Sequence, residues 1–268
     1  MRTTSAQQQL ILQQAARDRA GVARLVAGIV AVCLAALAIA GFFDAQRFID
    51  GMPAIAQLAS EMVPPDFGRW RAWLRPLLDT LAMSIAGTAL AVLLSLPLAL
   101  LAAPNTAPAS MIYRIARTVL AALRSVPEII FGVLLVAAVG FGALPGVLAL
   151  ALHSTGMMAK FYAEAIEHVD PRPLEAAVAA GASRLQVVIH AVLPQVLPQL
   201  ADITIYRWEY HFRASAVLGI VGAGGIGFEL MAALRLIRYD QVAAILITIL
   251  ACVVIVDALG AWLRRRLK

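Results

Sequence analysis

Charged residues are scarce in this sequence. Asp, Glu, Lys and Arg together make up 14% of its 268 residues, whereas 62% are hydrophobic. A soluble domain carries about 25% charged residues, so the apolar excess is too large for a soluble core to absorb. The mean hydropathy of +0.84 agrees with this. The composition therefore excludes an ordinary soluble protein and predicts an all-α integral membrane protein with one membrane domain.

Cysteines are also few, and a nucleotide-binding motif is missing. Cys33 and Cys252 both lie inside apolar runs, which predicts small buried side chains and no disulfide. The sequence lacks G-x-x-x-x-G-K-[ST], the loop that cradles the phosphates of ATP. We therefore expect no ATP site, no catalytic residue, no metal site and no cofactor on this chain.

The net charge of +6 reflects where the basic residues lie. Many of them flank apolar runs. This placement is expected in membrane proteins, because Lys and Arg are enriched in the segments on the cytoplasmic side of a membrane. An aromatic-rich basic face, which nucleic-acid binding would favour, is not evident in the sequence. We therefore expect a lipid bilayer around this chain and no nucleic-acid partner.

Six stretches are long and apolar enough to suggest membrane spans, each of which takes about 20 helical residues. The first is Leu25–Phe43. A cleaved signal peptide is its alternative, because Ala38-Ile39-Ala40 resembles a cleavage site, but the preceding polar segment is long for one. The other spans are expected at about 80–103, 118–139, 145–166, 196–218 and 241–263.

Basic segments predict the orientation of these spans. Residues 1–24 carry Arg2, Arg17, Arg19 and Arg24, the loop between the second and third spans carries Arg114 and Arg117, and residues 264–268 end in Arg264, Arg265, Arg266 and Lys268. With six alternating spans, all three segments fall on one side, which should be cytoplasmic. We expect a permease domain over 25–263 in a bacterial inner membrane, with both termini and a polar stretch at about 167–195 in the cytoplasm.

That polar stretch contains the most distinctive pattern of the chain. Residues 171–195 read PRPLEAAVAAGASRLQVVIHAVLPQ. The two prolines at its start should end the preceding helix, and Leu174–Ala180 predicts a short helix. Gly181 permits a sharp turn. A second short helix is expected over Leu185–Val192 and should stop at Pro194. An ordinary amphipathic connector is the alternative, but it does not account for this order of residues.

The order resembles the signature of ABC importer permeases: Glu-Ala-Ala, three residues, Gly, nine residues, Ile, one residue, Leu-Pro. Ala191 stands where the signature has isoleucine. The resemblance implies that this loop is a coupling helix that docks into a groove on a cytoplasmic ATPase. The residues that match the signature and would make the contact are Glu175, Ala176, Ala177, Gly181 and Pro194.

Other stretches resemble the phosphonate-transport branch of these permeases. Arg124-Ser125-Val126-Pro127-Glu128 is similar to its Arg-x-x-Pro-Glu segment, and residues 206–227 follow a pattern of similar form, with His211 where asparagine is frequent. The resemblance covers about 78–263 and implies inward transport of phosphonate or a related phosphorus oxyanion. An ABC permease for methionine or another small solute, and a non-ABC secondary transporter, are the alternatives.

Ionisable residues of the fifth span are candidates for the translocation pathway. Intramembrane charges normally face a bundle interior or a wet cavity, which selects Arg207, Glu209 and Arg213. Glu209 and Arg213 are four residues apart and are expected to pair along one helical face. Arg124 and Glu128 have the same spacing. A purely structural ion pair is the alternative for Glu209 and Arg213 and the favoured interpretation for Arg124 and Glu128.

Glycines after the fifth span complete the candidate pathway or gate. Gly222, Gly224 and Gly227 match the dinucleotide fingerprint G-x-G-x-x-G. That fingerprint needs a preceding strand within a βαβ unit, whereas here it lies between membrane spans. A tight re-entrant or outer-face turn, which includes Gly225, is the favoured interpretation.

The resemblance also implies partners. ATP and Mg would bind to a dimer of a separate cytoplasmic ATPase, and an extracytoplasmic binding protein would deliver the substrate. Six spans are too few to enclose a gated pathway comfortably, so we expect a second copy of the chain with the pathway on the two-fold axis. Transport would proceed by alternating access.

The orientation is testable with single cysteines in a chain that lacks Cys33 and Cys252. Thr3→Cys, Val178→Cys and Leu267→Cys should all escape an impermeant thiol reagent applied outside intact cells, because all three positions are expected in the cytoplasm. Permeabilised cells provide the control and should show labelling. Labelling of position 178 from outside would contradict the placement of the polar stretch.

Overall fold

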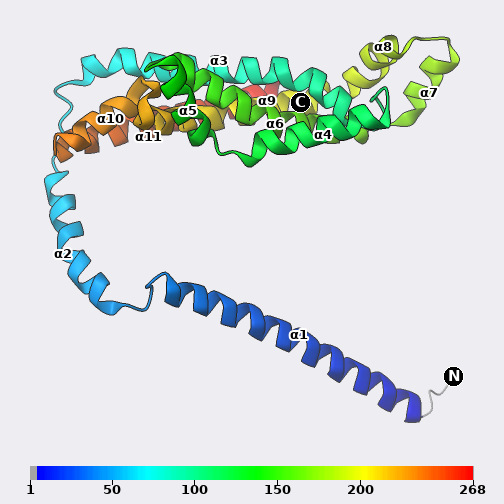
Figure 1. Cartoon of the computed structure of the whole chain (residues 1–268), viewed down its shortest axis with the longest axis horizontal. Helices are drawn as coiled ribbons and strands as arrows, with labels where there is room; N and C mark the ends of the chain where they lie inside the picture. Colours follow the sequence, from blue (N-terminus) through cyan, green and yellow to red (C-terminus); the bar gives the residue numbers. More distant parts are fainter. Residues whose placement is uncertain (1–4, 268) are drawn as a thin grey trace. The chain divides into compact units, whose positions relative to one another are not determined.

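The computed structural model describes residues 5–267, with the side chains of residues 5–18 and 20 outside its description. Arg2, Arg17 and Lys268 therefore lie outside the described part of the basic segments. Eleven α-helices and two π-helical segments occur over residues 5–267 (Figure 1): α1 Ser5–Ile39, α2 Ala45–Glu61, α3 Trp70–Ala102, α4 Ser110–Ser125, α5 Glu128–Val139, α6 Ala143–Glu167, α7 Pro171–Ala179, α8 Arg184–Val187, η1 Val188–Val192, α9 Leu193–Leu218, η2 Gly219–Ala223, α10 Gly225–Arg235 and α11 Tyr239–Leu267.

The chain forms two compact units, Met1–Ser60 and Glu61–Lys268. In the first unit, α1 is a long helix whose part Gly21–Ile39 is apolar enough to cross a membrane. Gly41, with φ of +77°, ends this helix and leads into α2. The helical nature of the first expected span is thereby confirmed.

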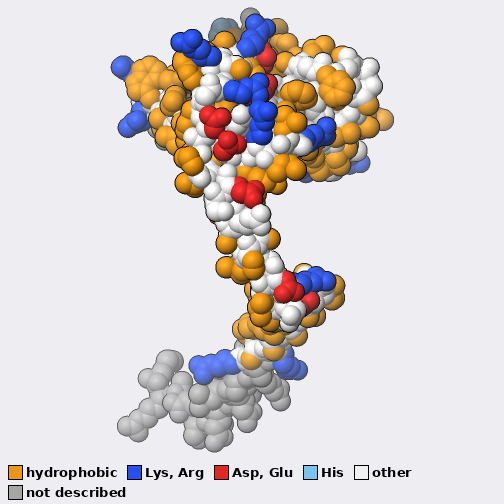
Figure 2. Space-filling model, turned by 90° about the vertical axis from the view of Figure 1, so that its left-hand side faces the viewer, with side chains coloured by type: hydrophobic (Ala, Val, Ile, Leu, Met, Phe, Trp, Pro, Cys, Tyr) orange, Lys and Arg blue, Asp and Glu red, His pale blue; other side chains and the backbone are white. Residues whose placement is uncertain are grey.

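The second unit, called the membrane unit below, is built around α6. This helix packs against α3, α4, α5 and α9, and α11 packs against α9 and α10. Small residues allow the close approach: Gly87 of α3 faces the side chain of Leu150, and Gly156 of α6 faces the backbone of α4. Hydrophobic side chains cover much of the visible surface (Figure 2), as expected for helices that face lipid.

The expected count of six spans is not confirmed. Four single helical segments have the length and apolarity of a span, namely Gly21–Ile39, Trp70–Ala102, Arg184–Ala223 and Tyr239–Leu267, and the bent pair α4 and α5 makes a possible fifth. The expected span at 145–166 is the 25-residue helix α6. Polar residues of this helix, such as His153 and Lys160, lower its mean hydropathy. Because four helices surround it, α6 needs little lipid-facing surface.

The expected straight span at 118–139 is wrong. The structure breaks it into α4 and α5, which meet at an angle of 83°. Pro127 stands at the break. Its ring disfavours a helical conformation in the preceding residue, and Val126 is indeed extended, with φ of −94° and ψ of 119°. The second expected span also begins earlier than residue 80, because α3 starts at Trp70.

Candidate functional site

The coupling loop, residues 167–195, forms a helical hairpin. Helix α7 is followed by a turn at Gly181, where φ is +83°, and the chain then enters α8. The two short helices and the glycine turn are thus confirmed. The expected stop at Pro194 is wrong, because α8 continues through the π-helical segment η1 into α9. The π segment changes the hydrogen-bond register, so the missing N–H of Pro194 does not end the helix.

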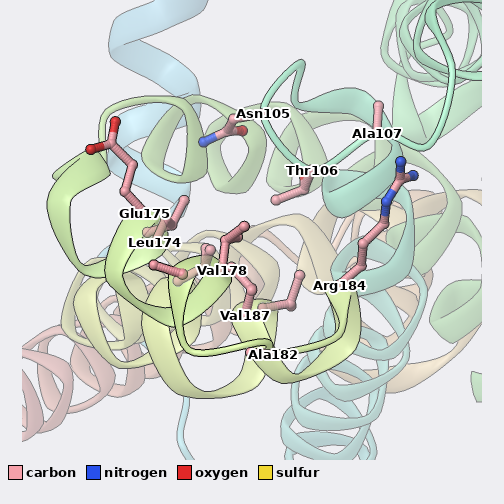
Figure 3. Close-up of a pocket in the computed structure, with 12 residues that line it drawn as sticks. Asn105, Thr106, Ala107, Leu174, Glu175, Val178, Ala182, Arg184 and Val187 are labelled. Atoms are coloured by element: carbon pink, nitrogen blue, oxygen red, sulfur yellow. The ribbon is translucent and has the colours of Figure 1, made fainter.

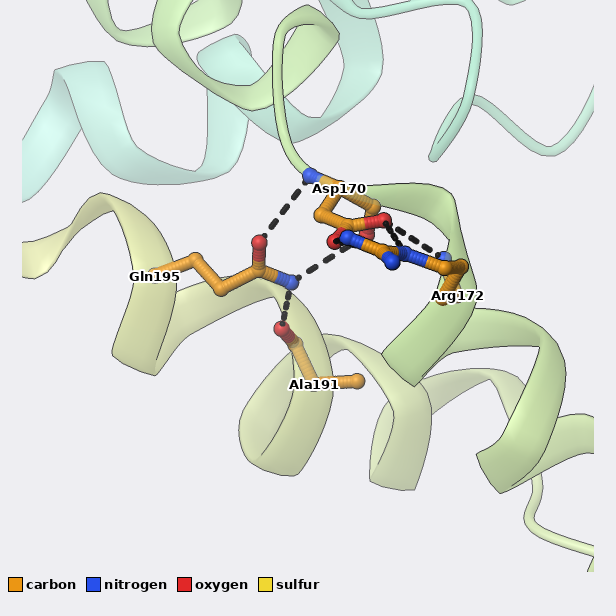
Figure 4. A network of polar contacts seen from close by, with 4 residues as sticks. All are labelled: Asp170, Arg172, Ala191 and Gln195. Atoms are coloured by element: carbon orange, nitrogen blue, oxygen red, sulfur yellow. Dashed lines mark hydrogen bonds and ion pairs between the residues drawn. The ribbon is translucent and has the colours of Figure 1, made fainter.

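Asp170 holds the start of the hairpin. Its carboxylate accepts hydrogen bonds from the backbone N–H of Arg172 at 3.0 Å and from the Arg172 guanidinium at 2.6–3.1 Å. These bonds, the guanidinium first, lower the pKa of Asp170 below its ordinary value of 3.8. Gln195 ties this corner to α9: its Oε1 accepts from the Asp170 N–H at 3.0 Å, and its Nε2 donates to the Ala191 carbonyl at 2.7 Å (Figure 4).

The start of α8 is capped in a similar way. The Ser183 hydroxyl accepts from the backbone N–H of Gln186, whose side-chain oxygen in turn accepts from the Ser183 N–H at 2.8 Å. This reciprocal cap satisfies two backbone donors that the helix itself leaves free. With Asp170 capping α7 and Ser183 capping α8, both short helices of the hairpin have a defined start.

A groove of about 730 Å³ lies along the hairpin. The loop after α3 forms one wall, and α7, α8 and η1 form the other. Glu175 and Arg184 stand at opposite ends of it (Figure 3). The lining of the groove is mainly apolar. Val178, which lines it, and Leu185 of α8 expose 61% and 68% of their surface. Exposed apolar side chains on an ordered hairpin are typical of a surface that docks onto another protein. The groove is lined by Asn105, Thr106, Ala107, Leu174, Glu175, Val178, Ala179, Ala182, Arg184, Val187, Val188 and Val192.

A second polar cluster is buried inside the membrane unit. Arg207 and His211 of α9 are 4% and 0% exposed. Arg207 Nη2 donates to the Ser154 hydroxyl at 2.5 Å, and Ser154 is also hydrogen-bonded to His211 Nε2. On the other side of the ring, His211 Nδ1 lies 2.7 Å from the Thr88 hydroxyl. The cluster thereby joins α3, α6 and α9.

The expected pair of Glu209 and Arg213 is wrong. Glu209 is buried and pairs with Arg264 at 2.7 Å, whereas Arg213 is half-exposed and pairs with Asp257 at 2.9 Å. Both partners belong to α11, which packs against this side of α9. Gly260 makes the first pair possible, because the Glu209 carboxylate occupies the space that a side chain at 260 would need.

The expected pair of Arg124 and Glu128 is also wrong. The bend at Pro127 separates their two helices, so the spacing of four residues no longer places them on one face. Glu128 instead accepts a hydrogen bond from the Tyr210 hydroxyl and lies 3.4 Å from His153 Nε2. Sequence reasoning missed Ser154, Thr88 and His153, because polar residues inside apolar runs have no distinctive spacing. Asp257 could have been found from the sequence, because an acidic residue inside an apolar span is itself a signal of a functional or paired charge.

The glycine segment forms a tight turn, as expected. Gly222, Gly224 and Gly225 have φ values of +105°, +78° and +70°, which side chains disfavour. Gly227 lies against the backbone carbonyl of Ala216, where no side chain fits. The segment follows helix α9 and the π segment η2, so the strand that a dinucleotide fingerprint requires is replaced by helix.

Comparison with known proteins shows which family the chain belongs to. Residues 95–268 match the family model of binding-protein-dependent transport system inner membrane components. The chain belongs to this family. Its members are membrane components of transport systems that depend on a binding protein, so the membrane character inferred from composition is confirmed, and a non-ABC secondary transporter is ruled out as an alternative.

Two relatives within this transport family are close in sequence. The phosphite transport system permease protein PtxC of Stutzerimonas stutzeri is 62% identical over 243 residues, 91% of this chain and 88% of the relative. The phosphate-import permease protein PhnE of Mycolicibacterium smegmatis is 42% identical over 223 residues, 83% of this chain and 42% of the relative. Both are named as permease proteins.

A solved structure extends the comparison to the fold. The MetNI methionine ABC transporter, in an inward-facing conformation, matches with a TM-score of 0.66 over 76% of this chain and 99% of the matched chain. Its sequence identity of 23% is low, so this likeness concerns the fold alone. The permease fold expected from the coupling-loop signature is thus confirmed.

Asp170 should control the order of α7. Asp170→Ala removes both the helix cap and the ion pair, so exchange of the Arg172 amide, which donates to Asp170, should become about fivefold faster. Asp170→Asn is the matched variant: it keeps a capping oxygen, and exchange should rise less. Exchange measured by mass spectrometry on the purified chain tests this, and equal exchange in wild type and Asp170→Ala would contradict the capping role.

The same carboxylate predicts a pH dependence. Its pKa is lowered in the folded loop, so its contribution to stability is present above the ordinary value of 3.8 and is lost as the pH falls through the lower, folded value. Amide protection of α7, corrected for intrinsic exchange, should therefore stay constant between about pH 5 and 8. It should decrease only in more acidic solution, and Asp170→Asn should not show this decrease.

Proposed function

We propose that this chain is the membrane-spanning subunit of an ATP-driven importer for phosphite, phosphonate or a related phosphorus oxyanion. The observation that carries the proposal is the 62% identity to a phosphite permease across 91% of the chain. A relative named for phosphate import agrees with an oxyanion of phosphorus as the cargo. The likeness to a methionine transporter is one of fold and favours no second substrate.

The coupling loop is the proposed docking site for a cytoplasmic ATPase dimer, which binds ATP and Mg. An apolar groove and an exposed apolar tip support this assignment. In the hairpin, Glu175, Ala176 and Ala177 lie on α7, Gly181 forms its turn, and Pro194 lies where η1 passes into α9. Small side chains let α7 approach a partner closely, while Glu175 offers a charge to an arginine of that partner.

The transport pathway is proposed to lie between two copies of the chain in a bacterial inner membrane. Both termini and the coupling loop face the cytoplasm, and an extracytoplasmic binding protein delivers the anion to the other side. The continuous path of α8, η1 and α9 links the ATPase contact to the pathway. Movement of the hairpin would thus move α9 and drive alternating access. The proposed pathway and gate residues are Arg207, Glu209, Arg213, Gly222, Gly224, Gly225 and Gly227.

Transport assays can test the proposed cargo. Membrane vesicles should contain this chain with the ATPase and binding protein of its own host. We expect ATP-dependent uptake of phosphite, phosphate or methylphosphonate and no uptake of methionine. Vesicles with the ATPase but without this chain are the control. ATP-dependent methionine uptake, with none of the phosphorus oxyanions transported, would contradict the proposal.

Gly181 should be needed for coupling. Its φ of +83° costs about 1–2 kcal/mol for a residue with a side chain, while nothing within 4 Å would crowd an added Cβ. Gly181→Val should therefore misalign α7 and α8 and abolish most of the stimulation of ATP hydrolysis by substrate-loaded binding protein.

Gly181→Asn provides the matched variant, because asparagine tolerates this backbone conformation better than other residues with side chains. It should retain most of the stimulation. Both variants should be compared in reconstituted vesicles at equal ATPase content. Full stimulation in Gly181→Val would show that the hairpin angle has no part in coupling.

A further inference from the structure

Arg207 differs from the other arginines of α9 and α11 that lie near carboxylates. Arg264 pairs with Glu209, and Arg213 pairs with Asp257. Arg207 is more deeply buried than either, yet no carboxylate lies within 4.0 Å of it among the side chains that the structure describes. A buried charge inside a membrane protein is costly and marks a functional site by default. Glu128 acts on Arg207 from beyond 4.0 Å and is itself hydrogen-bonded to Tyr210, so Arg207 has no carboxylate in direct contact.

Hydrogen bonds hold Arg207 and His211 in one cluster. The Thr88 hydroxyl donates to the Ser84 carbonyl at 2.7 Å, so it accepts from His211 Nδ1–H. Nε2 of His211 is hydrogen-bonded to the Ser154 hydroxyl, whose oxygen also accepts from Arg207 Nη2. Thr88 and Ser154 thereby satisfy both ring nitrogens of His211, and Arg207 belongs to the same series of hydrogen bonds.

One donor of the Arg207 guanidinium has no hydrogen-bond partner in the described part of the chain. The plane of the guanidinium lies over the Tyr210 ring, with the central carbon 4.4 Å from the ring centre. Its Nη2 is bound to Ser154, while Nε is buried and without a hydrogen-bond partner. The hydroxyl of Tyr210 donates to Glu128, so that carboxylate is bound to Tyr210 and makes no ion pair with Arg207 within 4.0 Å. Guanidinium N–H groups in this fork match the spacing of oxygens in a phosphorus oxyanion.

We propose that Arg207, oriented by Ser154 and Tyr210, is an oxyanion-binding subsite for the transported anion inside the membrane unit. The inference rests on the proposed function and names the residue that neutralises the cargo. In this structure the subsite is closed, because Arg207 is 4% exposed. Ser154 lies on α6 and Arg207 on α9, so separation of these two helices would open it. The free Nε–H then binds one oxygen of the anion.

Two variants separate the effect of the Arg207 charge from the effect of its hydrogen bond to Ser154. Arg207→Gln removes the cation, and Ser154→Ala keeps the cation but removes its orienting oxygen. Arg265→Gln is the control, because it removes an exposed cation of the same unit that lies outside the cluster. Each complex, with its ATPase and binding protein, is reconstituted in vesicles. Uptake of labelled phosphite is measured over a range of concentrations, together with ATP hydrolysis and melting temperature.

Arg207→Gln should lose phosphite uptake by about 20-fold or more, while ATP hydrolysis without substrate persists. Ser154→Ala should raise the KM for phosphite about fivefold with little change in Vmax. Arg265→Gln should resemble wild type. A second readout, the melting temperature of the membrane complex without binding protein, needs no transport. Phosphite at 20 mM, compared with chloride at equal ionic strength, should raise the melting temperature of the wild-type complex. It should leave the melting temperature of the Arg207→Gln complex unchanged.

The outcomes separate the subsite from the transport function. If wild type imports phosphite while Ser154→Ala and an assembled Arg207→Gln do so with normal KM and Vmax, the subsite is overturned and the function stands. If Arg207→Gln fails to assemble, Ser154→Ala decides, because an unchanged KM in that variant also overturns the subsite. If wild type imports no phosphorus oxyanion, the proposed function itself fails.

Discussion

Polar side chains inside the membrane unit have no bulk water to bind, so they depend on other parts of the protein for hydrogen bonds. This constraint accounts for the polar contacts that join its helices. The hydrogen-bonded series from Arg207 through Ser154 and His211 to Thr88 joins α9, α6 and α3. Glu128 is satisfied by Tyr210 and His153 across the bend that follows α4.

The same constraint ties α11 to α9. Two ion pairs and a glycine that makes room for a carboxylate hold these helices together. Helix α9 is also continuous with the coupling loop through η1. A displacement of the hairpin therefore reaches three neighbours of α9 by direct contact: α3, α6 and α11. These contacts connect a small surface loop to helices at the centre of the unit.

Local features of the sequence predicted the hairpin well. Prolines in the first turn of α7, glycine at the turn and small residues between them act over a few residues, and the structure has a helix, a turn and a second helix in that order. The same local reasoning failed at two other prolines. Pro127 bends a span that was expected to be continuous. Pro194, by contrast, was expected to end a helix but lies inside one, because the π-helical segment η1 precedes it and passes directly into α9. A proline alone does not reveal which of these outcomes its neighbours permit.

The sequence by itself determined that this is an all-α membrane protein with a helix-turn-helix loop, because apolar run length and turn residues act along the chain. It also selected Arg207, Glu209 and Arg213 as candidate intramembrane charges. Only the tertiary structure decided their partners. Ser154 is 53 residues from Arg207, and Asp257 is 44 residues from Arg213. Such contacts depend on which helices pack together and on which face, a property that no local spacing encodes.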